Sequence, residues 1–335
     1  MANTSGFVPM KIVILGADGC LASGFVGLVD ILWLARRALT EGAGPAPFEI
    51  VTASIAGAPV TDGHGRRLDV DSDVFAITRC DAIIIAGFAP DSENRPPALD
   101  ALRPLAHWVR DQHSKGALAC GSCSGVFLLG EAGLLDARRC TTTWWLHDEL
   151  KYRYPDADSS YGATLIEDRR VVTAGGPLSW IDLALFVVRK LCGPDAARRA
   201  ADFAVVDTTP STQAVYVPLG HLATADPFLS DAKRIVRNAG AEPLTARELA
   251  RRIAVSERTL HRRLKQASGE APKTFIDRIR FETARTALEG HTKSLKQIAI
   301  DAGYSDEASF RRTFKKLSGM TPGAYRGWSL SRMRC

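Results

Sequence analysis

A cysteine in a run of small residues is the feature of this sequence that most directly suggests chemistry. Gly121-Ser-Cys123-Ser-Gly125 follows the apolar run 117–120 and opens a helical stretch over 124–135. In a nucleophile elbow, small neighbours permit a strained strand-to-helix turn, and the turn exposes the nucleophile. The N-terminus of the following helix would favour a thiolate. The pattern therefore predicts an exposed Cys123 with thiolate character.

The other cysteines give weaker indications of chemistry than Cys123. Cys120 and Cys123 have the spacing of a redox pair, but Cys120 lies in a predicted strand and is more simply explained as a core residue. The chain has seven cysteines, an odd number, mostly in apolar surroundings, as expected of buried thiols in a reducing compartment. It has no second cysteine pair and no pair of histidines at ligand spacing, so we expect no metal site and no cofactor.

A second group of residues suited to binding lies on two predicted helices near the C-terminus. Apolar residues recur at i, i+4 in each helix, at 260 and 264 and again at 310 and 314, and these form a buried stripe. Long polar side chains on the opposite face of such a helix can read base edges in a major groove. The candidate base-contacting residues are Glu257, Arg258, His261, Arg262, Glu307, Ala308, Arg311 and Arg312.

These two helices belong to a duplicated segment. Residues 249–272 are echoed by 298–322 at an offset of 50, slipping to 49 in the first helix. Each copy has a short helix, a tight turn and a second helix opened by a serine, Ser256 or Ser305, that can cap free backbone N–H groups. Between the copies, residues 273–289 have apolar residues at helical spacing and predict one rigid connecting helix.

The charge distribution separates the chain into two halves. The total is only +6, but residues 226–335 carry 23 Lys+Arg and 12 Asp+Glu, a net of +11, and the rest of the chain carries −5. A basic segment of this size is typical of a protein that binds the phosphate backbone of nucleic acid. A solvated basic surface is the alternative.

With both motifs and the Gly-Tyr-Ser turn at 303–305, residues 243–328 resemble the DNA-binding domain of the AraC/XylS family. The resemblance implies two helix-turn-helix units that enter successive major-groove segments of double-stranded DNA, a homodimer, and contact with RNA polymerase. Ala254 departs from it, because a glycine is usual there, and a left-handed alanine would cost about 1 kcal/mol. Phosphate contacts are expected from Arg251, Arg252, Lys265, Lys315 and Lys316.

In the first half, apolar runs alternate with helical stretches. Buried parallel strands are predicted at 11–15, 48–53, 82–86, 117–120 and 171–174, and helices at 24–40, 98–114, 124–135, 144–153 and 179–192. This alternation predicts a doubly wound, flavodoxin-like α/β domain with a ligand crevice at the C-terminal ends of the strands. We therefore expect an α/β domain over 1–205, a linker over 206–225 and an all-α domain with two helix-turn-helix motifs over 226–335.

The longest uncharged apolar run, 82–90, is too short for a membrane span of about 20 residues. The N-terminus lacks the basic and apolar segments of a secretory signal. The expected location is the cytoplasm, with no membrane partner.

Around the elbow, residues 10–195 resemble the class I glutamine amidotransferase-like superfamily in its PfpI-type branch. The elbow itself, residues 127–136 and residues 174–182 carry the resemblance. Family enzymes place a histidine after a pair of threonines and an acidic residue in the first strand–helix loop, but this chain has Thr143 and Ser23 there. Without a base, Cys123 is not activated in the usual way. His147, one turn beyond Thr143, is the candidate substitute for that base.

The favoured function is a transcriptional regulator whose enzymatically silent first domain binds a small, nitrogenous metabolite. Trp144 and Trp180 would be placed to cage a cationic amine, with simple packing as the alternative. A Cys-dependent hydrolase or amidase tethered to DNA, and an architectural DNA protein without an effector, are the other hypotheses, and activation or repression is left open. The expected effector pocket comprises Asp18, Gly87, Phe88, Cys123, Thr143, Trp144 and Trp180.

Overall fold

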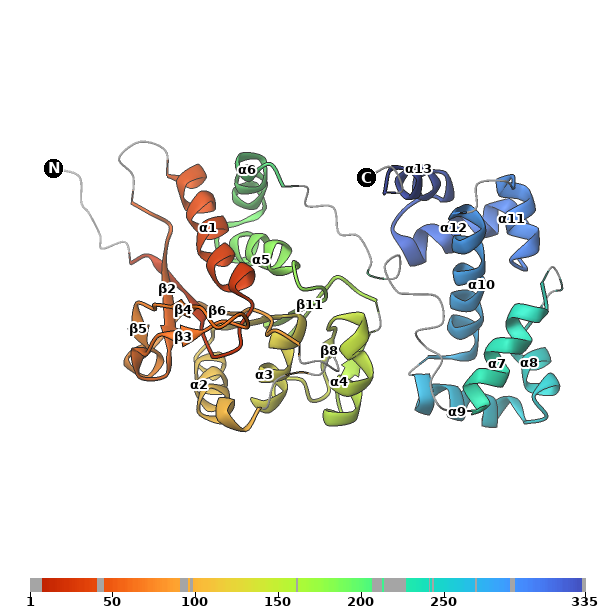
Figure 1. Ribbon diagram of the computed structural model, residues 1–335, viewed down its shortest axis with the longest axis horizontal. Helices are drawn as coiled ribbons and strands as arrows, with labels where there is room; N and C mark the ends of the chain where they lie inside the picture. Colours follow the sequence, from red (N-terminus) through yellow and green to blue (C-terminus); the bar gives the residue numbers. More distant parts are fainter. Residues whose placement is uncertain are drawn as a thin grey trace. The chain divides into compact units, whose positions relative to one another are not determined.

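The computed structural model describes residues 8–40, 45–90, 96, 99–160, 162–206, 213, 227–240, 242, 244–268, 270–289 and 293–332 (Figure 1). The chain divides into two compact units, Met1–Gln213 and Ala214–Cys335. The first unit is an α/β domain and the second is helical, as the sequence predicts.

The first unit is built on a seven-stranded sheet of order β10-β11-β7-β6-β1-β2-β5. Its strands are β1 (Met10–Leu15), β2 (Phe48–Ser54), β5 (Ser72–Asp73), β6 (Ala82–Ile85), β7 (Leu118–Ser122), β10 (Leu165–Asp168) and β11 (Val171–Ala174). All neighbours pair in parallel except β10 and β11, which form an antiparallel edge. The central strands are buried on both faces, which explains their continuous Ile and Val runs.

Helices cover both faces of this sheet. On one side lie α1 (Ala22–Leu39), α5 (Trp180–Cys192) and α6 (Pro194–Ala204), and on the other lie α2 (Arg103–Ser114) and α3 (Val126–Glu131) (Figure 1). The helix α4 (His147–Arg153) follows the short strand β8 (Arg139–Cys140), which pairs with β9 (Asp158–Ser159). A hairpin of β3 (Val60–Thr61) and β4 (Arg67–Leu68) completes the unit. The doubly wound class is confirmed. The additions to the predicted elements are the sheet strands β5 and β10, the helix α6 and the short strands β3, β4, β8 and β9.

Three predicted helices in this unit begin later than expected, each after a 3-10 turn. These turns are formed by residues 100–102 before α2, residues 123–125 before α3 and residues 144–146 before α4. The helix α3 also ends earlier than residue 135, because Gly133 adopts the left-handed conformation with φ of 66°. A left-handed glycine is a common way to terminate a helix.

The second unit consists, over its described residues, of seven helices. They are α7 (Pro227–Asn238), α8 (Ala246–Arg252), α9 (Glu257–Ser268), α10 (Pro272–Glu289), α11 (Leu295–Asp301), α12 (Glu307–Ser318) and α13 (Pro322–Arg332). The connecting helix α10 runs between two groups, with α7, α8 and α9 at one end and α11, α12 and α13 at the other (Figure 1). The two predicted helix-turn-helix motifs are α8–α9 and α11–α12.

The helix α10 contributes to two separate cores. Phe275, Ile276 and Ile279 pack with residues of α7, α8 and α9. Phe281, Ala284 and Leu288 pack with residues of α11, α12 and α13. Each motif is therefore completed by one half of the same helix.

The turns of the two motifs differ by one residue. Ala254 and Gly303, 49 positions apart, both have positive φ, of 58° and 82°. The next helix is capped by Ser256 in the first copy, whose Oγ accepts from the Thr259 N–H at 3.1 Å. In the second copy Asp306 caps instead, accepting from the Ser309 N–H at 2.7 Å. The expected cap by Ser305 is wrong, because the extra turn residue makes Asp306 the counterpart of Ser256.

Candidate DNA-binding surface and effector site

The elbow has the backbone geometry expected of it. Cys123 follows β7 with φ of 52°, in the left-handed region that a side chain adopts only under constraint. Gly125 leaves room for this turn, since a Cβ there would lie 2.5 Å from the carbonyl oxygen of Ala86. The strained strand-to-helix turn is therefore present, with Cys123 at its apex.

The thiol itself does not match the expectation. Cys123 is only 3% exposed, and burial raises its pKa to about 11, against a smaller opposing effect of hydrogen bonds with Ser124. The predicted exposed thiolate is wrong because desolvation outweighs the helix terminus, which is here a 3-10 turn followed by a six-residue helix. A thiol in this state is protonated at neutral pH.

Several predicted pocket residues do lie around the elbow. A Cβ on Gly87 would lie 3.1 Å from the Cys123 Cβ and 3.6 Å from its Sγ. The Ser124 Oγ accepts a 2.8 Å hydrogen bond from the N–H of Phe88 and is 3.1 Å from the Phe88 carbonyl oxygen. The Thr142 hydroxyl donates to the Cys123 carbonyl oxygen at 2.8 Å. These contacts fix the elbow from two neighbouring loops.

Thr143 and His147 lie on the segment that follows β8. Thr143 is fully buried, and its Oγ1 has no hydrogen-bond partner among the described residues. Nδ1 of His147 is 3.4 Å from Asp148 Oδ1, and Nε2 is 3.3 Å from Ser159 Oγ. A buried hydroxyl without a partner is costly unless a ligand or water completes it.

The remaining predicted pocket residues, Asp18, Trp144 and Trp180, have contacts with groups other than the elbow. Asp18 is exposed, and its carboxylate accepts the Thr61 N–H at 2.7 Å. Trp144 packs edge-to-face on Trp145, with ring centroids 5.1 Å apart. The Trp180 ring lies against α1, where a Cβ on Gly27 would come within 2.4 Å of it. The amine cage formed by Trp144 and Trp180 stays a prediction.

One residue of this site was missed by the sequence analysis. Gln213, in the predicted linker, is 5% exposed. Its Nε2 donates to the carbonyl oxygens of Thr142 at 3.0 Å and Ala163 at 2.8 Å, and its Oε1 accepts from the Trp144 N–H at 3.2 Å. The surrounding Thr, Pro and Ser residues gave no sign that a side chain here would be buried.

In the second unit, the two second helices present the predicted faces. On α9 the residues Glu257, Arg258, His261 and Arg262 are exposed, whereas Leu260 and Leu264 are fully buried. An open hollow on this face is lined by Arg258, Thr259, His261, Arg262 and Lys265, of which Thr259 was not predicted.

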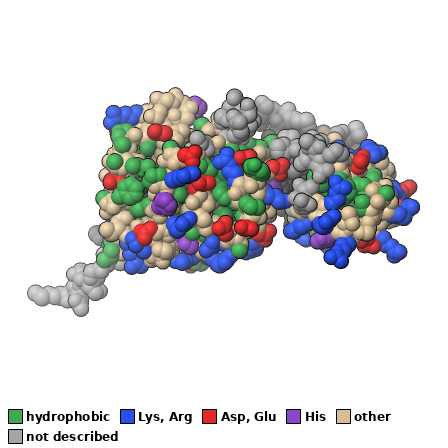
Figure 2. All heavy atoms as spheres, turned by 90° about the horizontal axis from the view of Figure 1, so that it is seen from below, with side chains coloured by type: hydrophobic (Ala, Val, Ile, Leu, Met, Phe, Trp, Pro, Cys, Tyr) green, Lys and Arg blue, Asp and Glu red, His purple; other side chains and the backbone are tan. Residues whose placement is uncertain are grey.

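On α12 the pattern is the same. Ala308, Arg311 and Arg312 are exposed, Glu307 is half-buried, and Phe310 and Phe314 are fully buried. The Arg311 guanidinium donates to Glu307 Oε1 at 2.8 and 2.5 Å, which orients it along the helix. Figure 2 shows Lys and Arg side chains outnumbering Asp and Glu on the face of the helical unit that it presents.

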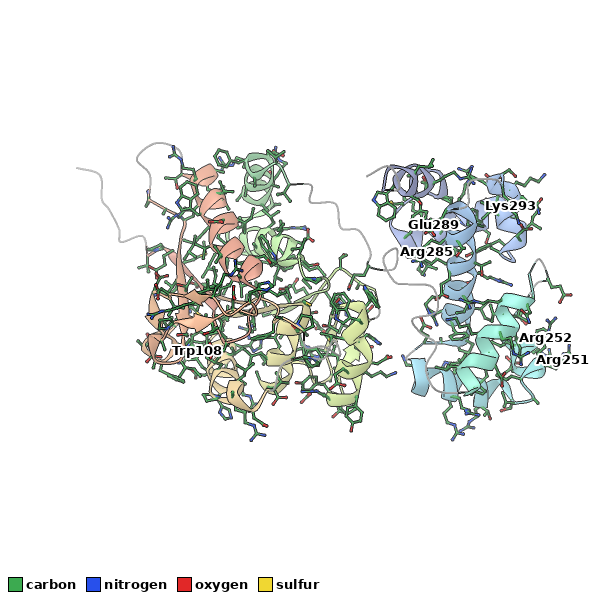
Figure 3. The ribbon with its side chains drawn as sticks, viewed as in Figure 1. Trp108, Arg251, Arg252, Arg285, Glu289 and Lys293 are labelled. Atoms are coloured by element: carbon green, nitrogen blue, oxygen red, sulfur yellow. The ribbon has the colours of Figure 1, made fainter. Side chains whose placement is uncertain are left out.

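The predicted phosphate contacts fall into two groups. Lys315 and Lys316 are exposed at the end of α12. Arg251 and Arg252, on α8 at the outer edge of this unit (Figure 3), form ion pairs with Glu248 at 2.7 and 2.8 Å. These hydrogen bonds lower the pKa of Glu248 to about 2. Phosphate binding would thus have to compete with a carboxylate for both arginines.

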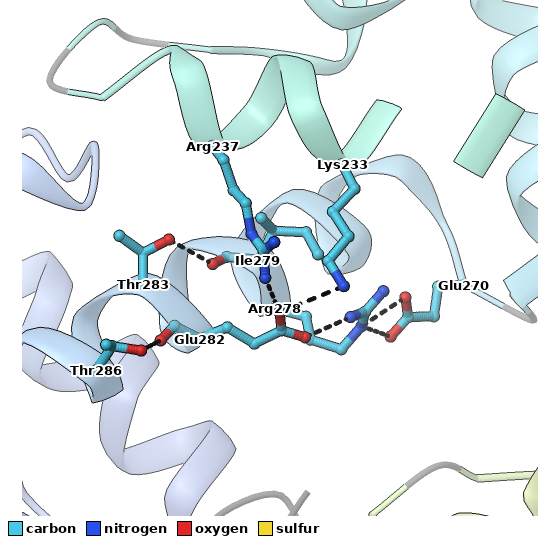
Figure 4. A network of polar contacts seen from close by, with 8 residues as sticks. All are labelled: Lys233, Arg237, Glu270, Arg278, Ile279, Glu282, Thr283 and Thr286. Atoms are coloured by element: carbon cyan, nitrogen blue, oxygen red, sulfur yellow. Dashed lines mark hydrogen bonds and ion pairs between the residues drawn. The ribbon is translucent and has the colours of Figure 1, made fainter. Parts of the chain in front are cut away.

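A buried ion network ties α7 to α10 (Figure 4). Glu282 accepts from Arg278 at 2.9 Å and from Arg237 at 3.2 Å, and it lies 3.9 Å from Lys233 Nζ. Arg278 also binds Glu270 with two 3.0 Å contacts. Burial lowers the pKa of Lys233, with Glu282 opposing this. The network holds α7 against α10.

The opposite end of α10 carries a smaller polar cluster. Arg285 lies 3.9 Å from Glu289, and the Tyr325 hydroxyl of α13 donates to Glu289 at 2.6 Å (Figure 3). No cluster of three or more metal-ligating side chains occurs among the described residues, and no helix in the described ranges is long and apolar enough to span a membrane.

Known proteins match both units. A family model described as a helix-turn-helix domain matches residues 249–327, and the DJ-1/PfpI family model matches residues 10–190. The HTH-type transcriptional regulator CdhR of Pseudomonas aeruginosa is 28% identical over 312 residues, covering 91% of this chain and 88% of that protein. The HTH-type transcriptional regulator GlxA of Rhizobium meliloti is 30% identical over 299 residues, covering 87% and 88%.

A crystal structure of a protein from Vibrio parahaemolyticus shares the fold of the first unit. It is 18% identical, with a TM-score of 0.50, and the match covers 58% of this chain and 99% of that one. Fold, surface and matches together define a DNA-binding protein in which a DJ-1/PfpI domain is followed along the chain by two helix-turn-helix motifs. The chain belongs to the AraC family of transcriptional regulators, in the group with an N-terminal DJ-1/PfpI domain.

Proposed function

We propose that the regulator reads DNA sequence with the exposed faces of α9 and α12 and senses a small molecule at the elbow of its first unit. The observation that carries the DNA reading is the pair of matched helices, each with a buried apolar stripe and exposed arginines opposite. Arginine binds guanine O6 and N7 with two hydrogen bonds, which makes Arg258, Arg262, Arg311 and Arg312 suited to base contacts.

The length of α10 supports simultaneous reading by both motifs. Its 18 residues extend about 27 Å at 1.5 Å per residue. Successive major-groove segments on one face of B-DNA are about 34 Å apart. Two helices that project from the ends of α10 therefore suit neighbouring segments of the groove.

The first unit acts, in this proposal, as a receptor and not as an enzyme. A protonated, buried Cys123 is a poor nucleophile, and a threonine stands where family enzymes carry the catalytic histidine. The unpaired hydroxyl of Thr143 beside the elbow supports a binding role, because a ligand group would complete its hydrogen bonding. A homodimer and contact with RNA polymerase stay predictions from the family resemblance.

The DNA-reading part is tested by selecting bound duplexes from a random pool with the full chain. Arg262→Ala and Arg312→Ala should each relax the preference at one position and cost about 1–3 kcal/mol of binding. Arg234→Ala is the control, because it removes an equal charge from an exposed, ion-paired residue on α7. An unchanged site preference in both recognition variants would contradict the assignment of these helices.

The receptor part is tested by screening metabolites for a rise in melting temperature of the full chain, since a ligand that binds only the folded state stabilises it. A hit should also change affinity for the selected DNA site. Cys123-dependent turnover of an amide would instead favour the hydrolase hypothesis.

A further inference from the structure

The side chain of Gln213 is held in the first unit as a bound ligand would be. Both hydrogens of its amide nitrogen point to backbone carbonyl oxygens, of Thr142 and Ala163, and its oxygen meets the backbone N–H of Trp144. Its own backbone N–H donates to the Gly162 carbonyl oxygen at 2.9 Å. Both donors of the carboxamide nitrogen and the carboxamide oxygen thus have main-chain partners.

The space around this carboxamide is shaped by a glycine. A Cβ on Gly175 would lie 1.9 Å from Gln213 Nε2 and 2.4 Å from its Cδ. Gly175 does not have a left-handed backbone, so the glycine is required for space and not for conformation. A flat group fits there only because residue 175 lacks a side chain.

The groups that bind the carboxamide are positioned without its help. The Thr141 hydroxyl lies 3.0 Å from the Ala163 carbonyl oxygen and 3.1 Å from that of Ser160. The Thr141 N–H donates to Thr173 Oγ1 at 2.9 Å, and the Gly175 N–H donates to the Thr164 carbonyl oxygen at 2.8 Å. The two acceptors and one donor would therefore remain in place if Gln213 left.

This carboxamide site adjoins the elbow. The Thr142 carbonyl oxygen accepts a hydrogen bond from Gln213, and the Thr142 hydroxyl donates one to the Cys123 carbonyl oxygen. The next residue, Thr143, has the buried hydroxyl without a hydrogen-bond partner among the described residues. A molecule larger than a side-chain amide would find a further hydrogen-bonding group close by.

We propose that Gln213 is an internal ligand of the effector site, and that the effector displacing it carries a primary carboxamide or urea group. This rests on the proposed receptor function. A carboxylate is excluded because its oxygens would face two carbonyl oxygens, and an N,N-dialkyl amide is excluded because it lacks donors. Displacement releases the residue that fastens the chain to the first unit before it continues toward α7.

The test is a titration of the full chain with propionamide, the side-chain analogue of glutamine, followed by calorimetry. Gln213→Ala should tighten propionamide binding about tenfold, because a tethered competitor is removed. Gly175→Ala should also expel the Gln213 side chain. It should nevertheless abolish propionamide binding, because the added methyl group occupies the carboxamide site. Propionate and N,N-dimethylpropionamide are the ligand controls and should not bind.

Absence of binding to folded Gln213→Ala, equal affinity for wild type and this variant, or retained binding in Gly175→Ala would each overturn the proposal. The metabolite screen separates this inference from the receptor function on which it rests. If another metabolite raises the melting temperature of the full chain while these results are negative, only the internal-ligand inference fails.

Discussion

The hydroxyl of Thr142 donates a 2.8 Å hydrogen bond to the carbonyl oxygen of Cys123. Both residues are buried, and Cys123 stands in the left-handed region. The strained elbow is thus fastened to the loop after β8, which also supplies a carbonyl oxygen to Gln213.

We expect Thr142→Val to destabilise the first unit by about 1–3 kcal/mol, because it keeps the shape and leaves a buried carbonyl oxygen without this donor. Urea unfolding followed by circular dichroism measures the loss. Thr40→Val is the control, since the Thr40 hydroxyl donates to the Arg36 carbonyl oxygen at the end of its own helix. An equal loss of unfolding free energy in both variants would show that the contact at the elbow contributes no more to stability than the contact at Thr40.

Cys123 should be slow to react in the folded protein. With a pKa of about 11 in place of 9.0, its thiolate fraction at pH 8 falls about a hundredfold. Iodoacetamide labelling read by peptide mass spectrometry should be correspondingly slower than in urea, and should accelerate as the pH rises toward 11. Rapid labelling of folded protein at pH 8 would contradict the buried thiol.

The same shift has a consequence for stability. Because the folded state holds the thiol proton more tightly than the unfolded state, Cys123 contributes stability below about pH 9 that is lost as pH rises toward 11.

The two turn positions should respond in opposite ways to exchange of alanine and glycine. Ala254→Gly should stabilise the second unit by up to about 1 kcal/mol, because it relieves a left-handed alanine. Gly303→Ala should destabilise it by more than that, because its Cβ would also lie 2.6 Å from the Gly240 carbonyl oxygen. Thermal unfolding of the full chain tests both; a loss of stability in Ala254→Gly would refute the first.

The buried network on α10 should be far more important to stability than the exposed pairs on α8. Glu282→Gln leaves Arg278 and Lys233 buried without their shared carboxylate and should cost about 3 kcal/mol or more. Glu248→Gln, the matched change in an exposed cluster, should have a small effect. Denaturant midpoints of the two variants give the comparison, and similar midpoints would disprove it.

Most of the sheet could be predicted because buried parallel strands are continuous apolar runs. The edge strand β10 was missed because Leu165-Ile-Glu-Asp168 carries two charges and is only half-buried. The helix α7 was missed although Phe228, Leu229, Ala232 and Val236 have helical spacing. Its buried Lys233 could not be foreseen, because only the fold brings Glu282 to it.

The candidate sites likewise have parts that could be predicted from the sequence and parts that could not. Exposed faces of α9 and α12 follow directly from the i, i+4 spacing of their buried residues. The burial of Cys123 depends on how closely Gly87 approaches it, which no local pattern encodes. Gln213 illustrates the limit most clearly, since its hydrogen-bond partners come from two separate segments of the chain, 142–144 and 162–163.

The sharing of α10 by two cores restricts how this protein can diverge. One residue inserted between Ile279 and Phe281 would rotate the second motif by about 100° and advance it about 1.5 Å relative to the first. In the proposed reading of DNA by α9 and α12, the two motifs could then no longer follow the same groove. On that proposal, relatives acquire new operators by exchanging side chains on α9 and α12, whereas insertions and deletions in this stretch of α10 should be eliminated by selection.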